Sequence, residues 1–321
     1  MSVPMAMPGT KAVRLFFAGL IFITFFSSLS CGAQSVYIPP DGKTLLFIGQ
    51  NKQSADDYVK AFGRHPAGFM MYTSVQKAQS LQEAFDDGAG VVHGQYLVEK
   101  YPVAALQIGL YMVDALDGIV RGNYDDTIDR IGLWIASTKR PVYLRIGYEF
   151  DGPHNHYDPR AYVPAYRYIV DRYRKAGIRN VSYVWHSFAS TMKQPPAVWY
   201  PGDDYVDWFG VSFFDNGTSP GMNAMVAMAK EHGKPLMIAE ATPMKIGVGA
   251  GKQAYYRWFR PLFKFIEKNN VKMLCYINAD WDSLPMFAAE KWKDSRVQTN
   301  DEIKKIWLEE TSKDRYNYFL K

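Results

Sequence analysis

From residue 44 onward the chain alternates short apolar runs with longer amphipathic runs, and this alternation limits the folds it can adopt. The apolar runs have strand length and predict β-strands at 44–49, 67–73, 104–113, 141–150, 180–188, 205–214, 234–240 and 271–279. Helical spacing predicts helices at 54–65, 93–102, 125–139, 159–177, 221–232, 252–269 and 300–309. A doubly wound open sheet shares this alternation, but eight units favour closure into a single α/β domain, a (β/α)8 TIM barrel.

The N-terminal residues have the layout of an export signal. Lys11 and Arg14 precede an apolar run from Leu15 to Phe26, and the small-residue stretch SSLSCGAQS follows. The apolar run is short for a bilayer span, which needs about 20 apolar residues. We therefore expect residues 1–33 to be a signal peptide and 34–321 to be the barrel domain, with an uncleaved anchor as the alternative.

A cysteine directly after the apolar run adds a second type of signal. Cys31 resembles the lipidated cysteine of bacterial lipoproteins, although Ser28 stands where such sites usually carry leucine. Cleavage after Ala33 competes with lipidation, and both remain open. In either case we expect an exported protein that is periplasmic, extracellular or attached to the outer membrane through a lipidated Cys31.

The charge and the cysteines exclude several classes of protein. Residues 1–33 carry two cations and no anions, so the formal charge falls from +5 to +3 without them. This mild charge and the lack of a Lys/Arg cluster argue against a nucleic-acid partner. Without Cys31 only Cys275 remains, so no disulfide framework can form. We expect a monomer without a cofactor.

Two of the predicted strands end on a glutamate. Glu149 closes the strand in PVYLRIGYEFDG (141–152), and Glu240 closes the one in KPLMIAEATP (234–243). The C-terminal ends of barrel strands form the mouth at which barrel enzymes carry their active sites. A lone glutamate there is more often a cap or a surface residue. Two carboxylates at one mouth are what the hydrolysis of a glycosidic bond requires.

Strand alternation predicts which neighbours share the inner face with each glutamate. With Glu149 pointing inward, Tyr143, Arg145 and Gly147 point inward too, and Tyr148 points outward with Val142, Leu144 and Ile146. In the second strand, Leu236 and Ile238 share the face of Glu240.

An arginine inside a barrel is costly unless it is paired. We therefore expect Arg145 to pair with Glu240 or Glu149, and as a partner of Glu240 to lower the pKa of that carboxyl. A purely structural ion pair near the barrel top is the alternative.

The order of these motifs resembles that of glycoside hydrolase family 26, within the clan of retaining (β/α)8 glycosidases. The resemblance rests on LRIGYEFDG (144–152), with its arginine four residues before the glutamate, on FIGQN (47–51), on YVDWFGVSFF (205–214) and on Trp281 after the last strand. It covers residues 44 to about 285. The family includes β-mannanases and enzymes that cut β-1,3-xylan or mixed-linkage β-glucan. It implies that Glu149 is the general acid/base and Glu240 the nucleophile of a double displacement.

The chain departs from the family pattern at three places. Tyr148 stands where the family usually has histidine, and Asp151 where it usually has asparagine. Phe213 and Phe214 stand where the clan often has a tyrosine that donates to the nucleophile. These departures bear on the substrate class more than on the mechanism.

Other side chains near the predicted mouth are weaker candidates. His154 and His156 follow the fourth strand and could bind a metal as a pair, but no further ligands are evident, so contact with substrate is favoured. His186 either lines the cleft or is a satisfied core histidine. Trp281 is either a platform for a sugar ring or a packing residue. The predicted substrate-binding residues are Arg145, Tyr148, Asp151, His154, His186 and Trp281, and no metal is expected.

These observations predict an exported, retaining endo-β-glycanase that hydrolyses mannan, β-1,3-xylan, β-glucan or a related polysaccharide. The alternative is a non-catalytic carbohydrate-binding barrel or a cell-envelope scaffold. Both glutamates and Arg145 favour the enzyme, because a protein that only binds glycan does not need a matched acid and nucleophile.

Overall fold

The computed structural model describes residues 1–2 and 37–320. The predicted signal peptide, except for Met1 and Ser2, and Cys31 therefore lie outside the described residues. No helix in the described part of the chain is long and apolar enough to cross a bilayer. The barrel lies in one compact unit that spans Ala33–Lys321.

Eight parallel strands in residues 37–320 form a closed barrel in chain order, which confirms the predicted (β/α)8 TIM barrel. Closure is made by β8 against β1, where Phe47 pairs with Cys275. The strands are β1 (Leu45–Gly49), β2 (Gly68–Ser74), β3 (Ala105–Tyr111), β4 (Val142–Ile146), β5 (Val181–Ser187), β6 (Trp208–Phe213), β7 (Leu236–Ala241) and β8 (Met273–Ile277).

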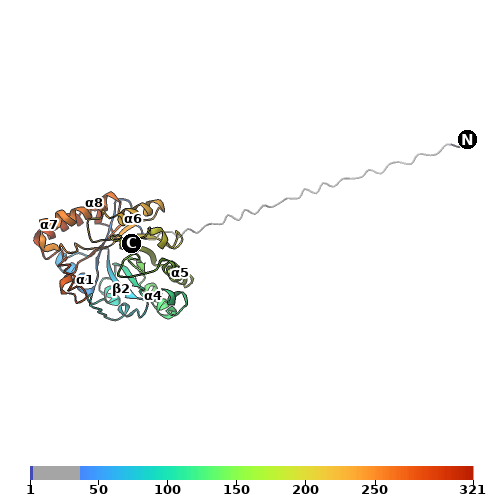
Figure 1. The fold of residues 1–321 in the computed structure, drawn as a ribbon, viewed down its shortest axis with the longest axis horizontal. Helices are drawn as coiled ribbons and strands as arrows, with labels where there is room; N and C mark the ends of the chain where they lie inside the picture. Colours follow the sequence, from blue (N-terminus) through green and yellow to red (C-terminus); the bar gives the residue numbers. More distant parts are fainter. Residues whose placement is uncertain (3–36, 321) are drawn as a thin grey trace. The chain divides into compact units, whose positions relative to one another are not determined.

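The helices surround the strands, and Figure 1 shows α1, α4, α5, α6, α7 and α8 around the sheet. The described helices are α1 (Lys52–Phe62), α2 (Gly94–Lys100), α3 (Leu116–Val120), α4 (Asp125–Thr138), α5 (Pro159–Lys175), α6 (Pro220–Glu231), α7 (Lys252–Ala254), α8 (Arg260–Lys268) and α9 (Asp301–Thr311). A π-helical turn, Tyr255–Phe259, joins α7 to α8. The single helix predicted at 252–269 is therefore interrupted.

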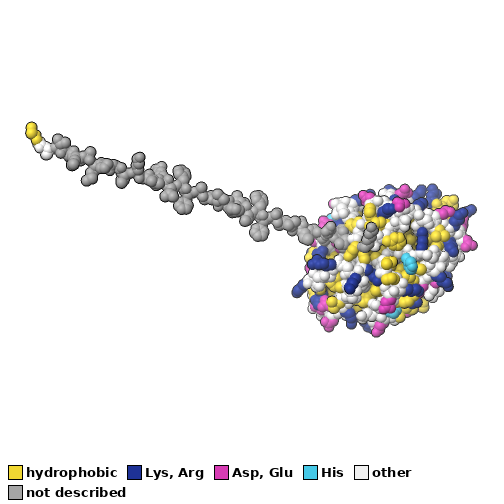
Figure 2. All heavy atoms as spheres, turned by 180° about the vertical axis from the view of Figure 1, so that it is seen from behind, with side chains coloured by type: hydrophobic (Ala, Val, Ile, Leu, Met, Phe, Trp, Pro, Cys, Tyr) yellow, Lys and Arg dark blue, Asp and Glu magenta, His cyan; other side chains and the backbone are white. Residues whose placement is uncertain are grey.

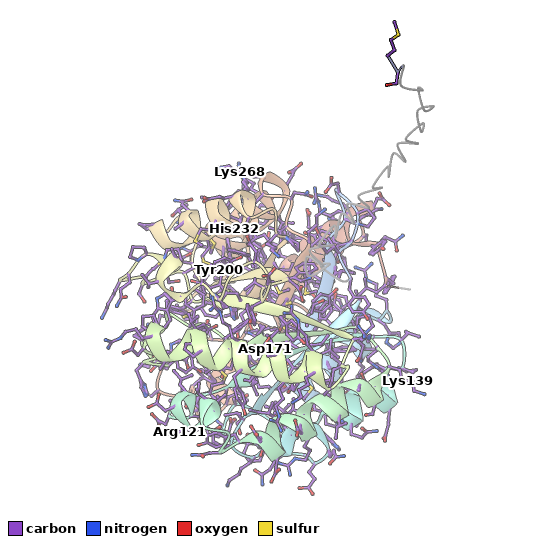
Figure 3. The ribbon with its side chains drawn as sticks, turned by 90° about the vertical axis from the view of Figure 1, so that its right-hand side faces the viewer. Arg121, Lys139, Asp171, Tyr200, His232 and Lys268 are labelled. Atoms are coloured by element: carbon purple, nitrogen blue, oxygen red, sulfur yellow. The ribbon has the colours of Figure 1, made fainter. Side chains whose placement is uncertain are left out.

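Local signals explain where the helices begin. The Asn51 side chain accepts a hydrogen bond from the backbone N–H of Ser54 at 2.9 Å, so α1 starts at Lys52, two residues before the predicted start at residue 54. Asp158 caps α5 in the same way, and Pro159 fills the first helical position, where its missing N–H costs nothing. Figure 3 shows α5, marked by Asp171, beside α4, which ends before Lys139. Arg172 of α5 joins the two helices by ion pairs with Asp125 and Asp129.

The hydrophobic core has an inner layer within the barrel and an outer layer between strands and helices. In β4, Tyr143 belongs to the inner layer, and the predicted outward positions Val142, Leu144 and Ile146 belong to the outer layer. Other members of the inner layer are Leu45, Phe47, Met70, Val184, Trp208, Met237, Met273 and Cys275. On the face shown in Figure 2, Lys and Arg are interspersed with Asp and Glu.

The end of the barrel opposite Glu149 is covered by residues close to both ends of the described range 37–320. Tyr143, near the start of β4, donates a hydrogen bond to the backbone oxygen of Tyr37 at 2.6 Å. Tyr318 and Leu320 pack partly buried against the inner layer.

Candidate active site

Glu149 lies beyond the end of its strand, on a turn that the sequence did not predict. β4 ends at Ile146, and Gly147 and Glu149 both have positive φ angles, +56° and +51°. For a residue other than glycine this conformation costs about 1–2 kcal/mol, and such residues cluster at functional sites. Asn155, only 2% exposed, stabilises the turn by donating to the backbone oxygens of Tyr148 at 2.8 Å and Glu149 at 3.1 Å.

The same turn brings Tyr148 into the site, so the predicted outward orientation of its side chain is wrong. Its ring lies 5.2 Å from the guanidinium carbon of Arg145 and 5.2 Å from the ring of Tyr72 on β2. Strand alternation no longer applies here because the strand has already ended. The turn therefore places the ring of Tyr148 beside Arg145, and the contact of Tyr148 with substrate stays a prediction.

Glu240 also faces inward for a reason that alternation did not predict. Val211 of β6 pairs with Ile238 of β7, but the next pair is Ser212 with Glu240, so β7 carries one extra residue, Ala239. Such a bulge reverses the alternation of side chains beyond it. Leu236 and Ile238 accordingly pack in the outer layer. The prediction that they share the face of Glu240 is wrong.

Arg145 pairs with Glu240, which confirms one of the two predicted partners. The Arg145 side chain is fully buried, and its Nη1 donates to Oε1 of Glu240. Burial raises the pKa of Glu240 above its ordinary value, while Arg145 and a hydrogen bond from Tyr72 act in the opposite direction. Arg145 thus lowers the pKa of Glu240, as expected, but burial outweighs this effect. Tyr72 supplies from β2 a hydroxyl donor that Phe213 and Phe214 cannot supply from β6.

A continuous series of polar contacts runs from Arg145 to Glu149. Arg145 Nη1 lies 3.3 Å from Nδ1 of His186, and Nε2 of His186 lies 3.0 Å from Oγ of Ser212. The Ser212 hydroxyl donates to Oε1 of Glu149. Burial, with the charge of Arg145, holds the pKa of His186 well below its ordinary value, so this imidazole is neutral. The structure thus places His186 inside the site as a fully buried connection between the two glutamates.

His154 and His156 point to different partners. Nε2 of His154 lies 2.8 Å from Oε2 of Glu149, and this contact raises the pKa of His154. The His154 side chain is 48% exposed, so Oε2 lies on the open side of the site. Nε2 of His156 lies 3.2 Å from Oδ1 of Asp114 instead. The two histidines form no shared ligand set, and no group of three or more potential metal ligands occurs among the residues described.

Asp151 and Trp281 contact protein groups. The Asp151 carboxylate accepts from the Ser187 hydroxyl at 2.9 and 3.0 Å and from the Phe188 N–H at 2.7 Å, which fixes the end of β5. Trp281 is 2% exposed and donates through Nε1 to Oγ1 of Thr242 at 2.9 Å. The expected open sugar platform at Trp281 is not found, because the rings of Phe287 and Trp292 pack against it at 4.6 and 4.8 Å.

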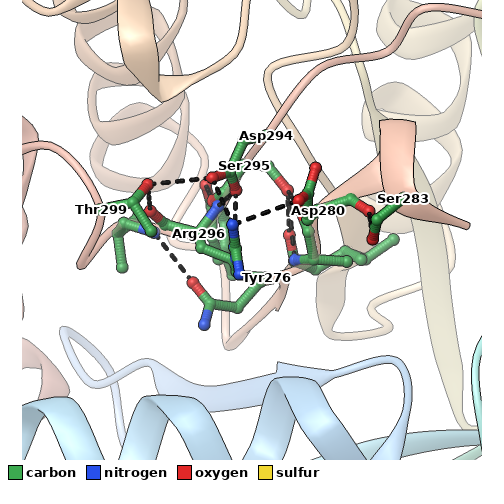
Figure 4. Close-up of polar contacts among 11 residues, drawn as sticks. Tyr276, Asp280, Ser283, Asp294, Ser295, Arg296 and Thr299 are labelled. Carbon is green, nitrogen blue, oxygen red and sulfur yellow. Dashed lines mark hydrogen bonds and ion pairs between the residues drawn. The ribbon is translucent and has the colours of Figure 1, made fainter.

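The loop after β8, which carries Trp281, is held by a polar cluster shown in Figure 4. Arg296 contacts Asp280 at 3.2 Å and Asp294 at 2.8 Å. The Ser295 hydroxyl donates to the backbone oxygens of Ile277 and Ala279, each at 2.8 Å. These contacts fix the loop to the end of β8.

Sequence reasoning missed Tyr72, Asn155, Ser187 and Ser212. Tyr72, Ser187 and Ser212 each lie near the C-terminal end of a strand that the sequence did predict, so a search for polar residues at those ends would have found them. Such a search would not have found Asn155, because this residue lies in a loop and contacts only backbone oxygens of the turn.

The arrangement can support displacement at a sugar carbon. Glu240 is fixed by a buried cation and a hydroxyl, whereas Glu149 has one oxygen held inside the site and the other on the open side. Two carboxylates in these settings suit a nucleophile and an acid/base, respectively.

Comparison with known proteins agrees with this geometry. The family model described as glycosyl hydrolase family 26 matches residues 126–283, which include both glutamates. β-1,3-Xylanase TXYA of Vibrio sp. is 34% identical over 305 residues, covering 86% of this chain and 66% of that protein. A β-1,3-xylanase of Alcaligenes sp. is 33% identical over 298 residues, covering 84% of this chain and 63% of that protein. The chain thus spans about two thirds of the length of these relatives.

Solved structures share the fold at low sequence identity. A family 26 β-mannanase from Bacteroides ovatus has a TM-score of 0.63 at 14% identity, covering 85% of this chain and 90% of its own. A family 26 endo-β-1,4-mannanase domain from Bacillus sp. JAMB-750 has a TM-score of 0.58 at 18% identity, covering 85% of this chain and 86% of its own. Fold, motif order and relatives agree: this chain belongs to glycosyl hydrolase family 26.

Proposed function

We propose that this protein is an endo-acting glycoside hydrolase that cleaves β-1,3-xylan with retention of configuration. The observation that carries the activity is the pair of glutamates, Glu149 on the turn after β4 and Glu240 on β7, joined by buried Arg145 and its polar neighbours. The substrate rests on two relatives named β-1,3-xylanases, each of which aligns with more than four fifths of this chain.

The proposed reaction is a double displacement. The Glu240 carboxylate attacks the anomeric carbon, and the glycosidic C–O bond breaks as Glu149 gives its proton to the leaving oxygen. Glu149 then takes a proton from water, and the resulting hydroxide displaces Glu240 from the glycosyl ester. Arg145 compensates the charge of Glu240 in the buried site, and the hydroxyl of Tyr72 holds this carboxylate in place.

A purely carbohydrate-binding barrel accounts less well for these contacts. Placing Glu240 beside fully buried Arg145 takes two charges out of water, which is costly. Holding Glu149 on a turn with a positive φ angle adds further strain. An enzyme gains a nucleophile and an acid from these arrangements, whereas a binding protein gains nothing comparable.

The test is hydrolysis of a panel of β-1,3-xylan, β-1,4-mannan and mixed-linkage β-glucan. We expect reducing ends and a range of xylo-oligosaccharides from β-1,3-xylan, with β-anomers formed first, as seen by NMR. Glu240→Gln is expected to lose nearly all activity and Glu149→Gln to lose about 10²–10⁴-fold. Mannan as the preferred substrate would overturn the proposed specificity, and α-anomers as first products would overturn retention. No hydrolysis of any glycan, with binding retained, would favour the binding barrel.

We further propose that the protein is exported, with residues 1–33 as its signal. The support is the basic start, the apolar run and the small-residue stretch around Cys31. Mass spectrometry of protein purified from a bacterial host is expected to show a new N-terminus after Ala33 or a diacylated Cys31. An intact Met1 on cell-associated protein would contradict cleavage.

A further inference from the structure

We propose that His186 and Ser212 are positioning residues that fix Glu149 with its transferable proton on Oε2. The inference deepens and rests on the proposed function, because it assigns how the acid/base of that reaction is held. It follows from the donors and acceptors along the contacts between Arg145 and Glu149.

The direction of each hydrogen bond in this series is set by the first group. A guanidinium has only donors, so Nδ1 of His186, 3.3 Å from Arg145 Nη1, accepts. The imidazole then carries its proton on Nε2, which donates to Oγ of Ser212 at 3.0 Å. With its oxygen accepting from His186, Ser212 directs its own hydrogen to Oε1 of Glu149.

This order of donors distinguishes the two oxygens of Glu149. Oε1 receives the Ser212 hydrogen inside the site, so the proton of the acid form resides on Oε2. Oε2 is the oxygen on the open side, where half-exposed His154 is its neighbour at 2.8 Å. The glycosidic oxygen of a substrate approaches from that side, and His154 is the group that it replaces.

The same series links the two glutamates. Arg145 Nη1 contacts both Glu240 and His186, so one buried cation orients the Glu240 carboxylate directly and the Glu149 carboxylate through two side chains. His186 and Ser212 do not need to touch the substrate. Loss of either is expected to disorder Glu149 while leaving Glu240 and its partners in place.

The kinetic test compares substrates whose leaving groups do and do not need protonation. Ser212→Ala is expected to lower kcat/KM for β-1,3-linked xylo-oligosaccharides by about 10–100-fold, the scale of a misplaced reacting group. For an aryl xylo-oligosaccharide with a dinitrophenyl leaving group, the loss is expected to be under about threefold, because that departure needs no acid. His186→Leu is expected to behave like Ser212→Ala, and the double variant to lose little more than either single one.

Two further variants separate positioning from general damage. His186→Gln can still accept from Arg145 and donate to Ser212, and it is expected to recover part of the activity lost in His186→Leu. Thr44→Val removes a buried hydroxyl just before β1, at the far end of the barrel, and serves as a matched control with unchanged leaving-group dependence. Equal losses on both substrates in Ser212→Ala, or additive losses in the double variant, would overturn the proposal.

A readout without substrate keeps this inference distinct from the proposed function. In ¹⁵N NMR of the wild-type protein, His186 is expected to be the neutral tautomer with its proton on Nε2 between pH 6 and 8. A proton on Nδ1 would overturn the proposed directions even if the enzyme is active. Failure of the wild-type protein to hydrolyse any glycan would instead refute the proposed function.

Discussion

At the scale of single residues, the two glutamates differ in what holds them. Glu240 contacts buried Arg145 and Tyr72, and both are fixed on strands. Glu149 contacts Ser212 on one oxygen and half-exposed His154 on the other. A nucleophile must keep its charge and its position throughout, whereas an acid/base must exchange protons with substrate and water. The difference in partners is therefore the one expected under the proposed roles, with Glu240 as the nucleophile and Glu149 as the acid/base.

Asn155 is expected to be needed for the turn that carries Glu149, although it lies outside the strands. Asn155→Asp keeps the volume but cannot donate to the backbone oxygens of Tyr148 and Glu149. We expect a loss of about 1–3 kcal/mol in unfolding free energy, since two buried acceptors lose their donor, and a marked fall in kcat. Urea unfolding and steady-state kinetics measure both. Unchanged kcat would show that the turn does not depend on Asn155.

His186 gives a prediction for the pH dependence of stability. Its pKa in the folded protein lies well below the ordinary value of 6.5, because it is buried beside Arg145. Below about pH 6.5 the unfolded chain therefore binds a proton that the folded chain does not, so stability falls as the pH falls. Above that pH the contribution is constant. The neighbours that face this ring are Arg145, Ser212 and, farther away, His154.

The measurement for His186 is the melting temperature of wild-type protein and His186→Gln from pH 8 to about pH 4.5. The difference between the two is expected to be constant above pH 7. Below about pH 6.5 the wild-type protein should lose stability more steeply than the variant. Parallel curves over the whole range would mean that the pKa of His186 is the same in the folded and unfolded states, and would contradict the prediction.

At the scale of elements, small irregularities place the site. The extra residue in β7 turns Glu240 inward, and the early end of β4 lets Gly147 and Glu149 redirect Tyr148. In both cases a regular strand would have placed the side chain elsewhere. The strands fix where the site lies, and their departures from regularity fix which side chains enter it.

Helices α1 and α2 are joined by the carboxylate of Asp56 in α1, which accepts hydrogen bonds from side chains of α2. Burial alone would raise the pKa of Asp56, but hydrogen bonds from Tyr96, Lys100 and Tyr101 lower it to about 2. Because the folded pKa lies below the ordinary value of 3.8, this stabilisation is present above about pH 4 and is lost as the pH falls toward about 2.

Asp56→Asn is expected to lower the free energy of unfolding by about 1–3 kcal/mol at pH 7, since charge-assisted hydrogen bonds are lost. The difference from wild type should shrink as the pH falls below about 4. Guanidinium unfolding of both proteins at a series of pH values measures this difference in unfolding free energy. Hydrolytic activity at 25 °C is expected to be unchanged, because this cluster lies on the outer helices.

At the scale of the whole molecule, closure of the barrel depends on the C-terminal helix. Trp307 of α9 donates to the hydroxyl of Tyr58 in α1 at 3.0 Å and packs on Tyr276 of β8 with ring centroids 4.7 Å apart. It therefore joins the last helix to the first helix and to the strand that closes the barrel. Contacts of this kind couple the two halves of a long chain into one folding unit.

Trp307→Ala is expected to lower the unfolding free energy by about 3–5 kcal/mol, as for other large aromatic residues removed from a core. Trp307→Phe should lose less, because the ring contacts partly remain. Thermal unfolding of both variants measures the effect. The kcat of each variant, calculated per folded molecule, is expected to be close to that of the wild type, since Trp307 does not contact the site. A large defect in this kcat would contradict the prediction.

The sequence by itself determined the fold and the position of the site. Apolar periodicity is a local property, so it predicted eight strands in chain order. Barrel anatomy then predicted Glu149 and Glu240 at one mouth, and the cost of burying an unpaired charge predicted that Arg145 pairs with a glutamate. Only the tertiary structure decided which side chains meet there. The bulge at Ala239 depends on how β7 pairs with β6, and the entry of Tyr148 depends on a turn held by Asn155. Tyr72, His186 and Ser212 reach the glutamates from other strands. Hydrogen bonds between strands distant in sequence leave no periodic signal, because register and rotamers are set by packing of the whole barrel.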